Sequence, residues 1–163
     1  MVDWFAFIIA LLAFMLSCFQ FLRDASLQKK ESTLNAYNEL QTSVFDMLNT
    51  GKYDKISEIE FESPEWKNIT GCLAKIERFS VGINSEIYSI DILNRLGGSY
   101  YIFKYYELKP IIDKKKEVNE VKGKHYDEFE LTVKRLEEYR ECKNFIEKSL
   151  KRMKWIINNY KLD

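Results

Sequence analysis

Few residues in this 163-residue chain have the types and spacing that catalysis requires. His125 is its single histidine, and a catalytic histidine needs a nucleophile and an orienting partner within hydrogen-bond reach. The sequence shows no recognisable pattern of that kind around His125, so a surface or packing role is the simpler interpretation. We therefore expect a protein without enzymatic activity.

Cysteines and glycines indicate no metal, cofactor or phosphate site either. Cys72 and Cys142 are far apart in the sequence and have no metal-ligand spacing beside them, which favours buried thiols. Gly97-Gly98-Ser99 resembles part of a phosphate-binding loop, but the preceding strand and the following Gly-Lys-Ser/Thr are missing, so close helix packing is the better explanation. We expect no cofactor.

The carboxylates fall into two kinds of sequence environment. Glu137 and Glu138 are interleaved with basic residues such as Arg135 on one predicted helix, a pattern typical of exposed, solvated charge. Glu77 borders an apolar stripe, and Arg95 on the following predicted helix can reach it if the two helices pack together. We predict a structural ion pair between Glu77 and Arg95.

The elements that position these residues are organised around the stretch Val2–Leu22, which reads VDWFAFIIALLAFMLSCFQFL and carries a charge only at Asp3. A helix of about 21 residues is about 31 Å long, close to the thickness of the hydrocarbon core of a bilayer. In lipid a helix satisfies its own backbone groups. We predict a transmembrane anchor over residues 1–23, with a span that includes Val2, Trp4, Leu12, Phe14 and Leu22.

A cleaved signal peptide, a lipoprotein signal and a buried core helix are the alternatives to this anchor. Signal peptides begin with a basic region, whereas no Lys or Arg precedes this span. Met15-Leu16-Ser17-Cys18 loosely resembles a lipoprotein cleavage site, in which Cys18 would carry the lipid. A core helix needs only about 10 to 14 apolar residues. Cleavage of the anchor and lipidation at Cys18 stay open.

Charge gives the expected orientation of the anchor. Arg23, Lys29 and Lys30 follow the span, while only Asp3 and the terminal amine precede it. Because Lys and Arg concentrate on the cytoplasmic side, we expect the N-terminus outside and residues 24–163 as a cytoplasmic helical domain. Three cysteines, one of them inside the span, make no disulfide framework and agree with that compartment.

The composition limits what the cytoplasmic part can be. Lys and Arg number 25, and so do Asp and Glu; the basic excess typical of nucleic-acid binding is missing, so we expect no nucleic-acid partner. About 140 residues are enough for one domain with its own core. Two prolines, six glycines and the lack of low-complexity tracts indicate no second domain.

The first two helices of this domain are predicted from their ends. No helix breaker separates the anchor from Gly51, so the anchor and the first bundle helix are expected to form one rod. The second helix begins at Ser63-Pro64-Glu65, where the serine caps, the proline suits the first position and the glutamate faces the positive end of the helix dipole.

The third helix follows Ser89, continues past Pro110 and ends near Gly123. Its expected buried stripe contains Leu93, Leu96, Tyr100, Phe103 and Tyr106, and Ile92, Ile102 and Tyr105 broaden the buried face. The last helix is predicted over Tyr126–Tyr160. Short connections place consecutive helices side by side, so we predict an all-α fold with a single N-terminal transmembrane helix followed by an antiparallel bundle of about four helices.

An antiparallel bundle would return the end of the last helix to the lipid surface. Five residues would then contact anionic headgroups: Lys148, Lys151, Arg152, Lys154 and Trp155. The alternative is that these cations only complement the dipole at the C-terminus of a helix.

Three segments from the middle of the chain together carry a resemblance to a known family: Ile76–Asn84, Asp91–Gly98 and Tyr106–Ile112. Their order resembles a family of small bacterial proteins with one N-terminal membrane helix and a cytoplasmic helical domain of unknown function. The residues that match best are Glu77, Gly82, Gly97, Gly98 and Pro110. The resemblance implies a bacterial inner-membrane protein and supplies no catalytic residues.

The expected function is that of a non-catalytic interaction module held at the inner membrane. Its expected partners are the lipid bilayer, an unidentified protein and a second copy of the chain, which would associate along the first bundle helix between Lys30 and Leu48. The alternative function is a membrane-acting effector of a defence or toxin system. Only Ser17, Cys18 and Gln20 are polar in the span after Asp3, which disfavours a conducting pore.

Overall fold

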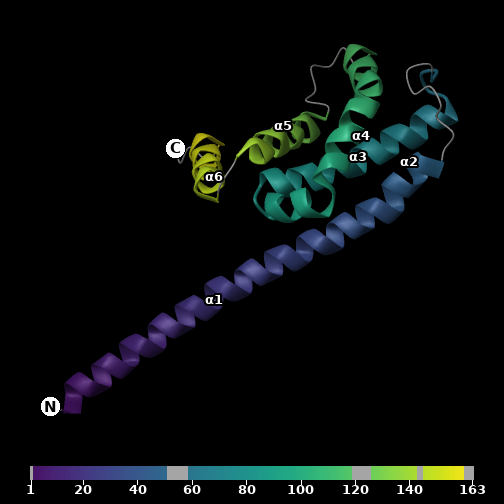
Figure 1. Ribbon diagram of the computed structural model, residues 1–163. Helices are drawn as coiled ribbons and strands as arrows, with labels where there is room; N and C mark the ends of the chain where they lie inside the picture. Colours follow the sequence, from purple (N-terminus) through teal and green to yellow (C-terminus); the bar gives the residue numbers. More distant parts are fainter. Residues whose placement is uncertain (1, 51–58, 119–125, 143–144, 160–163) are drawn as a thin grey trace.

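The computed structural model describes residues 2–50, 59–118, 126–142 and 145–159 (Figure 1). Their elements are α1 Val2–Leu40, the π-helical turn η1 Gln41–Phe45, α2 Asp46–Thr50, α3 Pro64–Asn84, α4 Ile90–Val118, α5 Asp127–Glu141 and α6 Phe145–Asn159. No strand occurs within these ranges. The all-α prediction is confirmed. The predicted helix ends at Gly51, Gly123 and Tyr160, and His125, lie outside the described residues.

The first helix is a rod with two different halves. α1 continues through η1 into α2 without a break, which confirms that the apolar N-terminal stretch and the first bundle helix are one element. Figure 1 shows the N-terminal half extending away from the rest of the chain, which gathers over the C-terminal half. The side chains of Trp4 to Leu22 are exposed, whereas Tyr37, Leu40 and Val44 are buried.

The core lies where α3, α4 and α5 pack together over the C-terminal half of this rod. The largest fully buried side chains are Phe45, Ile69, Leu73, Ile76, Ile83, Leu93, Tyr101, Leu108, Ile111, Ile112, Phe129 and Leu136. Aromatic rings join the helices, as where Tyr101 of α4 meets Phe129 of α5 edge to face at 5.0 Å between centroids. The core is therefore built from four helices, as the predicted bundle requires.

The start of α3 follows the capping chemistry expected from its sequence. Ser63 has an extended backbone, and its hydroxyl accepts a hydrogen bond from the backbone N–H of Trp66 at 3.1 Å. Pro64 occupies the first helical position, where its missing N–H costs no intrahelical bond. The predicted start of the second bundle helix is therefore confirmed.

The buried face of α4 differs from the predicted stripe. Leu93 and Tyr105 are buried as predicted, but the buried face also passes through Tyr101 and Leu108, while Leu96, Phe103 and Tyr106 are exposed. The backbone of Gly97 departs from helical geometry (φ −176°, ψ 32°) and turns the second part of α4 relative to the first. A Cβ atom at Gly97 would overlap the hydroxyl of Tyr37 on α1, so the glycine permits this close contact.

The single last helix predicted over Tyr126–Tyr160 is wrong, because the chain forms two helices there. Cys142 has an extended backbone (φ −69°, ψ 122°) after the end of α5, and α6 takes a different direction (Figure 1). No glycine or proline lies between α5 and α6, so the sequence has no helix-breaking residue at this point. Contacts from α6 to distant parts of the chain decide its position instead.

Candidate functional site

The apolar half of α1 is the first functional feature. Within the described residues it belongs to the one helix that is long and apolar enough to cross a membrane, and none of its most apolar window is buried against the domain. Trp4, Leu12, Phe14 and Leu22 are all exposed. A core helix of a water-soluble protein would bury such side chains, whereas the domain leaves the apolar surface of this half of α1 uncovered.

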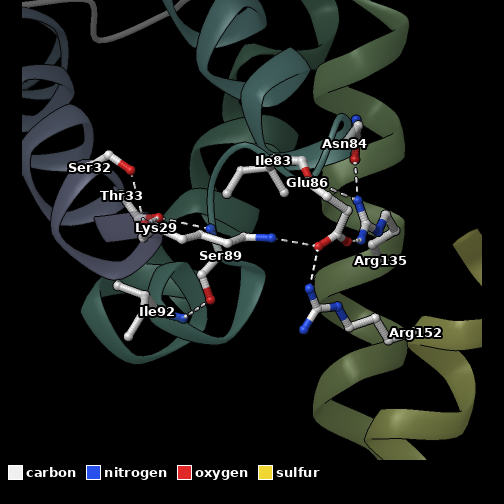
Figure 2. A network of polar contacts seen from close by, with 10 residues as sticks. All are labelled: Lys29, Ser32, Thr33, Ile83, Asn84, Glu86, Ser89, Ile92, Arg135 and Arg152. Atoms are coloured by element: carbon white, nitrogen blue, oxygen red, sulfur yellow. Dashed lines mark hydrogen bonds and ion pairs between the residues drawn. The ribbon is translucent and has the colours of Figure 1, made fainter. Parts of the chain in front are cut away.

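The second feature is a carboxylate that joins four parts of the chain. Glu86 lies in the turn between α3 and α4, where Figure 2 shows three cations converging on it. Its Oε2 accepts from Lys29 Nζ of α1 at 2.8 Å and from Arg152 Nη2 of α6 at 2.6 Å. Its Oε1 accepts from Arg135 Nη2 of α5 at 2.8 Å. The Glu86 cluster, as we name these four residues, therefore ties α1, α5 and α6 to one turn.

The turn that carries Glu86 is held against α1. Thr33, which is fully buried, accepts a hydrogen bond at its Oγ1 from the backbone N–H of Ser89 at 2.8 Å and donates to the carbonyl of Lys29 at 2.6 Å. Glu86 itself has a left-handed backbone (φ 58°), a conformation that costs a non-glycine residue about 1 kcal/mol. Local strain of that size is tolerated where surrounding contacts fix the turn.

Arg135 is the most buried cation of the cluster. Only 8% of the residue is exposed, and its Nη1 donates to the carbonyl of Ile83 at 3.2 Å and to Asn84 Oδ1 at 2.9 Å. Its guanidinium group lies over the ring of Trp155 of α6, 3.6 Å from the centroid, in a cation–π arrangement. The prediction that Arg135 belongs to an exposed charged face is therefore wrong.

The electrostatics of Glu86 favour the ionised carboxylate. Burial is the largest single influence and favours the neutral form, but the hydrogen bonds and charges of Lys29, Arg152 and Arg135 together outweigh it, so the pKa of Glu86 lies below its ordinary value. A carboxylate held ionised by three cations is a poor proton donor or acceptor near neutral pH. Its chemistry is therefore that of a structural junction.

A basic cleft of about 660 Å³ opens beside the Glu86 cluster. Its lining comes from α1 (Ala25, Ser26, Lys29, Lys30), the start of α4 with the residue before it (Ser89, Ile90, Asp91, Arg95), Tyr139 of α5 and α6 (Lys148, Ser149, Arg152). Five of these residues are cationic and one is acidic. The cleft therefore sets α6 opposite the stretch of α1 that directly follows its apolar half.

The predicted pair of Glu77 and Arg95 is corrected, because each residue has another partner. The two carboxylate oxygens of Glu77 accept the backbone N–H groups of Glu128 at 3.1 Å and Phe129 at 2.9 Å, in the first turn of α5. Arg95 pairs with Asp91 on its own helix at 3.0 Å. Helix α5 begins after Tyr126, whose side chain makes no capping bond, so Glu77 supplies the acceptors that its free N–H groups need.

The pKa of Glu77 lies above its ordinary value. Burial is the main cause, the two backbone N–H groups oppose it, and the neighbouring charges of Glu128 and Asp127 add to it. Glu77 is therefore a buried carboxyl whose capping bonds compensate only part of the cost of its charge.

Most of the residues predicted to contact a membrane surface hold α6 to the domain. Besides the Arg152 and Trp155 contacts described above, Lys148 Nζ lies over the ring of Tyr139 at 4.4 Å, and Lys151 Nζ donates to the carbonyl of Glu138 at 3.2 Å. Lys154 is exposed. Lipid contact by these residues stays a prediction.

The predicted self-association seam on the first bundle helix is mostly occupied within the chain. Tyr37, Leu40, Val44 and Leu48 belong to the domain core, so these side chains are not available to a second copy in the folded protein. Sequence analysis also missed Glu86 and Arg135 as a junction. Their spacing carries no signal, because the two residues are 49 positions apart and meet only through tertiary packing.

The described residues include no group of three or more His, Cys, Asp or Glu side chains able to hold a metal ion. Residues 6–136 match the family described as Domain of unknown function (DUF4760). The match begins in the apolar half of α1 and ends in α5, before α6. No curated protein and no solved structure matches the chain. Because the matched segment is well over half of the sequence, this chain belongs to the DUF4760 family.

Proposed function

We propose that this protein is a single-pass membrane protein whose helical domain lies at the cytoplasmic face of a bacterial inner membrane and acts there through protein contacts, without catalysis. The observation that carries the proposal is the exposed apolar half of α1, which continues without a break into a helix whose other half is domain core. A cleaved signal peptide would not be expected to share one helix with the core of the mature domain.

The continuous helix supports a fixed position of the domain relative to the bilayer. Lys29 lies seven residues beyond Leu22, about 10 Å along a helix, and there it bonds to Glu86 at 2.8 Å. Thr33, four residues later, bonds to the same turn. The domain is therefore attached to its anchor by a helix and by tertiary contacts close to the end of the span, rather than by a loose linker.

Anchors of this kind support association between copies. Every copy would present the same face of its domain at the same height, and confinement to a membrane raises the effective concentration of such faces. The part of α4 after Gly97 offers one apolar face, with Phe103 and Tyr106 exposed and Tyr100 half-buried. We propose a second copy of the chain as the occupant of this α4 face.

The anchor and its orientation are tested in cells. The protein should stay in the membrane pellet after alkaline carbonate extraction, and a C-terminal fluorescent-protein fusion should be bright while a C-terminal alkaline phosphatase fusion is inactive. Release by carbonate would refute the anchor. An active phosphatase fusion would refute the cytoplasmic orientation while leaving the anchor intact.

The contact between copies is tested by disulfide crosslinking in membranes. Phe103→Cys should give a disulfide-linked dimer in a Cys18→Ala background, because its side chain lies on the α4 face. Lys109→Cys is the matched control, since Lys109 is also exposed on α4 but points to another side of the helix. Equal crosslinking at both positions, or none at either, would remove the proposed contact.

A further inference from the structure

Helix α6 exposes an apolar stripe that the predicted bundle would have buried. Its residues are Ile146, Leu150, Met153 and Ile157, which are 69%, 53%, 57% and 63% exposed. They follow one another by four, three and four positions and so lie on one side of the helix. The contacts of α6 with the domain come from other positions, among them Arg152 on Glu86 and Trp155 beneath Arg135.

The position of α6 along α1 indicates what covers this stripe. The basic cleft places α6 opposite Ala25 and Ser26 of α1, and Figure 1 shows α6 on the side of the domain from which the apolar half of α1 extends. Ala25 is three residues beyond Leu22, about 4.5 Å along the helix. The polar layer outside the hydrocarbon core is about 5 to 8 Å thick on each side. An α1 that spans the bilayer therefore sets α6 at headgroup level.

The charge of α6 also suits a lipid surface. Between Phe145 and Asn159 the helix carries Lys148, Lys151, Arg152 and Lys154 against the single acid Glu147. Cations beside a narrow apolar stripe, in a helix of low overall hydrophobicity, are typical of helices that lie in the plane of the membrane interface. Lys154 borders the stripe on its polar side and is exposed, so it can reach lipid phosphates.

We propose that α6 is an interfacial helix whose apolar stripe inserts into the cytoplasmic leaflet between the headgroups and the acyl chains, with Lys154 on anionic phospholipid headgroups. The proposal rests on the proposed membrane anchor. It gives the protein a second attachment to the bilayer, beside the span. Because the Glu86 cluster joins α6 to α1, the two attachments together fix the rotation of the domain about the α1 axis.

The test uses the full chain in vesicles of phosphatidylcholine with and without phosphatidylglycerol. An environment-sensitive fluorophore is placed at Met153→Cys in a Cys18→Ala background, and at Lys67→Cys as the aqueous control, an exposed residue in the first turn of α3. Phe14→Cys reports on the span. We expect blue-shifted emission and quenching by lipid-borne quenchers at position 153, stronger with phosphatidylglycerol, and quenching by aqueous iodide at position 67.

The outcomes separate this inference from the proposed function. Equal iodide quenching at 153 and 67, with position 14 protected by lipid, overturns the interfacial helix and leaves the anchor intact. Iodide quenching at position 14 as well overturns the anchor. Emission at 153 that shifts with the protein-to-lipid ratio, while lipid-borne quenchers have no effect, assigns the stripe to a second copy and also overturns the proposal.

Discussion

Replacement of Glu86 by glutamine is the most informative change, because it removes one charge from the junction of α1, α5 and α6 and keeps the size of the side chain. Arg135 and Glu86 are only 8% and 16% exposed at their side chains, and a buried hydrogen bond between charged groups contributes about 1.5–3 kcal/mol. The ion pair of Glu86 with Lys29 is less buried, and in the pair with Arg152 the arginine is half exposed. We therefore assign a stabilising contribution of about 1 kcal/mol to the Lys29 pair and about 0.5 kcal/mol to the Arg152 pair.

These contributions overlap, because the three cations share one carboxylate, and the glutamine amide oxygen still accepts one hydrogen bond. We expect Glu86→Gln to lower the free energy of unfolding by about 2–3 kcal/mol, roughly 10 °C in the unfolding temperature of a domain of about 140 residues. The assay is thermal unfolding of the full chain in detergent micelles at pH 7, followed by circular dichroism. Glu141→Gln, an exposed residue on α5, is the control.

The pH dependence gives an independent check with a definite sign. The pKa of Glu86 is lower in the folded protein than its ordinary value, which is about 4.3 in an unfolded chain. Its stabilising contribution is therefore present above about pH 4.3 and is lost as the pH falls through the lowered folded value. The difference in the free energy of unfolding between wild type and Glu86→Gln should therefore shrink as the pH falls through that range. A variant as stable as Glu141→Gln at pH 7 would refute the junction.

Three further changes test other features. Gly97→Ala should cost about 1–3 kcal/mol by overpacking, since its Cβ would overlap the Tyr37 hydroxyl; Tyr37→Phe should rescue part of that loss in a double-mutant cycle, and additive effects would contradict the contact. Glu77→Gln should destabilise the domain by about 1 kcal/mol, because one N–H of α5 loses its acceptor. Because the pKa of Glu77 is raised in the folded protein, the free energy of unfolding of wild type should fall as the pH rises through that pKa. Denaturant titrations at several pH values should find this pH dependence missing in Glu77→Gln. Leu12→Arg with Phe14→Arg should reduce carbonate-resistant membrane insertion, since each arginine costs about 2.5–3.5 kcal/mol near mid-membrane; unchanged insertion would contradict a span centred there.

Local sequence signals predicted features that depend on near neighbours. The uninterrupted helix from the apolar stretch into the domain is confirmed because no breaker interrupts α1, η1 and α2. The start of α3 is confirmed because Ser63 and Pro64 act on their own helix. The predicted buried stripe of α4 is only partly right, since Leu96, Phe103 and Tyr106 are exposed. The backbone at Gly97 departs from the regular helix that a periodicity argument assumes.

By itself, the sequence determined an all-α chain whose first helix carries an apolar stretch longer than a core helix needs. Helix formation and the length of an apolar stretch are both properties of contiguous residues. Only the tertiary structure decided that the last helical segment divides at Cys142 and that Glu77 caps α5. It also decided that Glu86 gathers Lys29, Arg135 and Arg152. These partners lie tens of residues apart, so the energy that selects them exists only once the chain has packed.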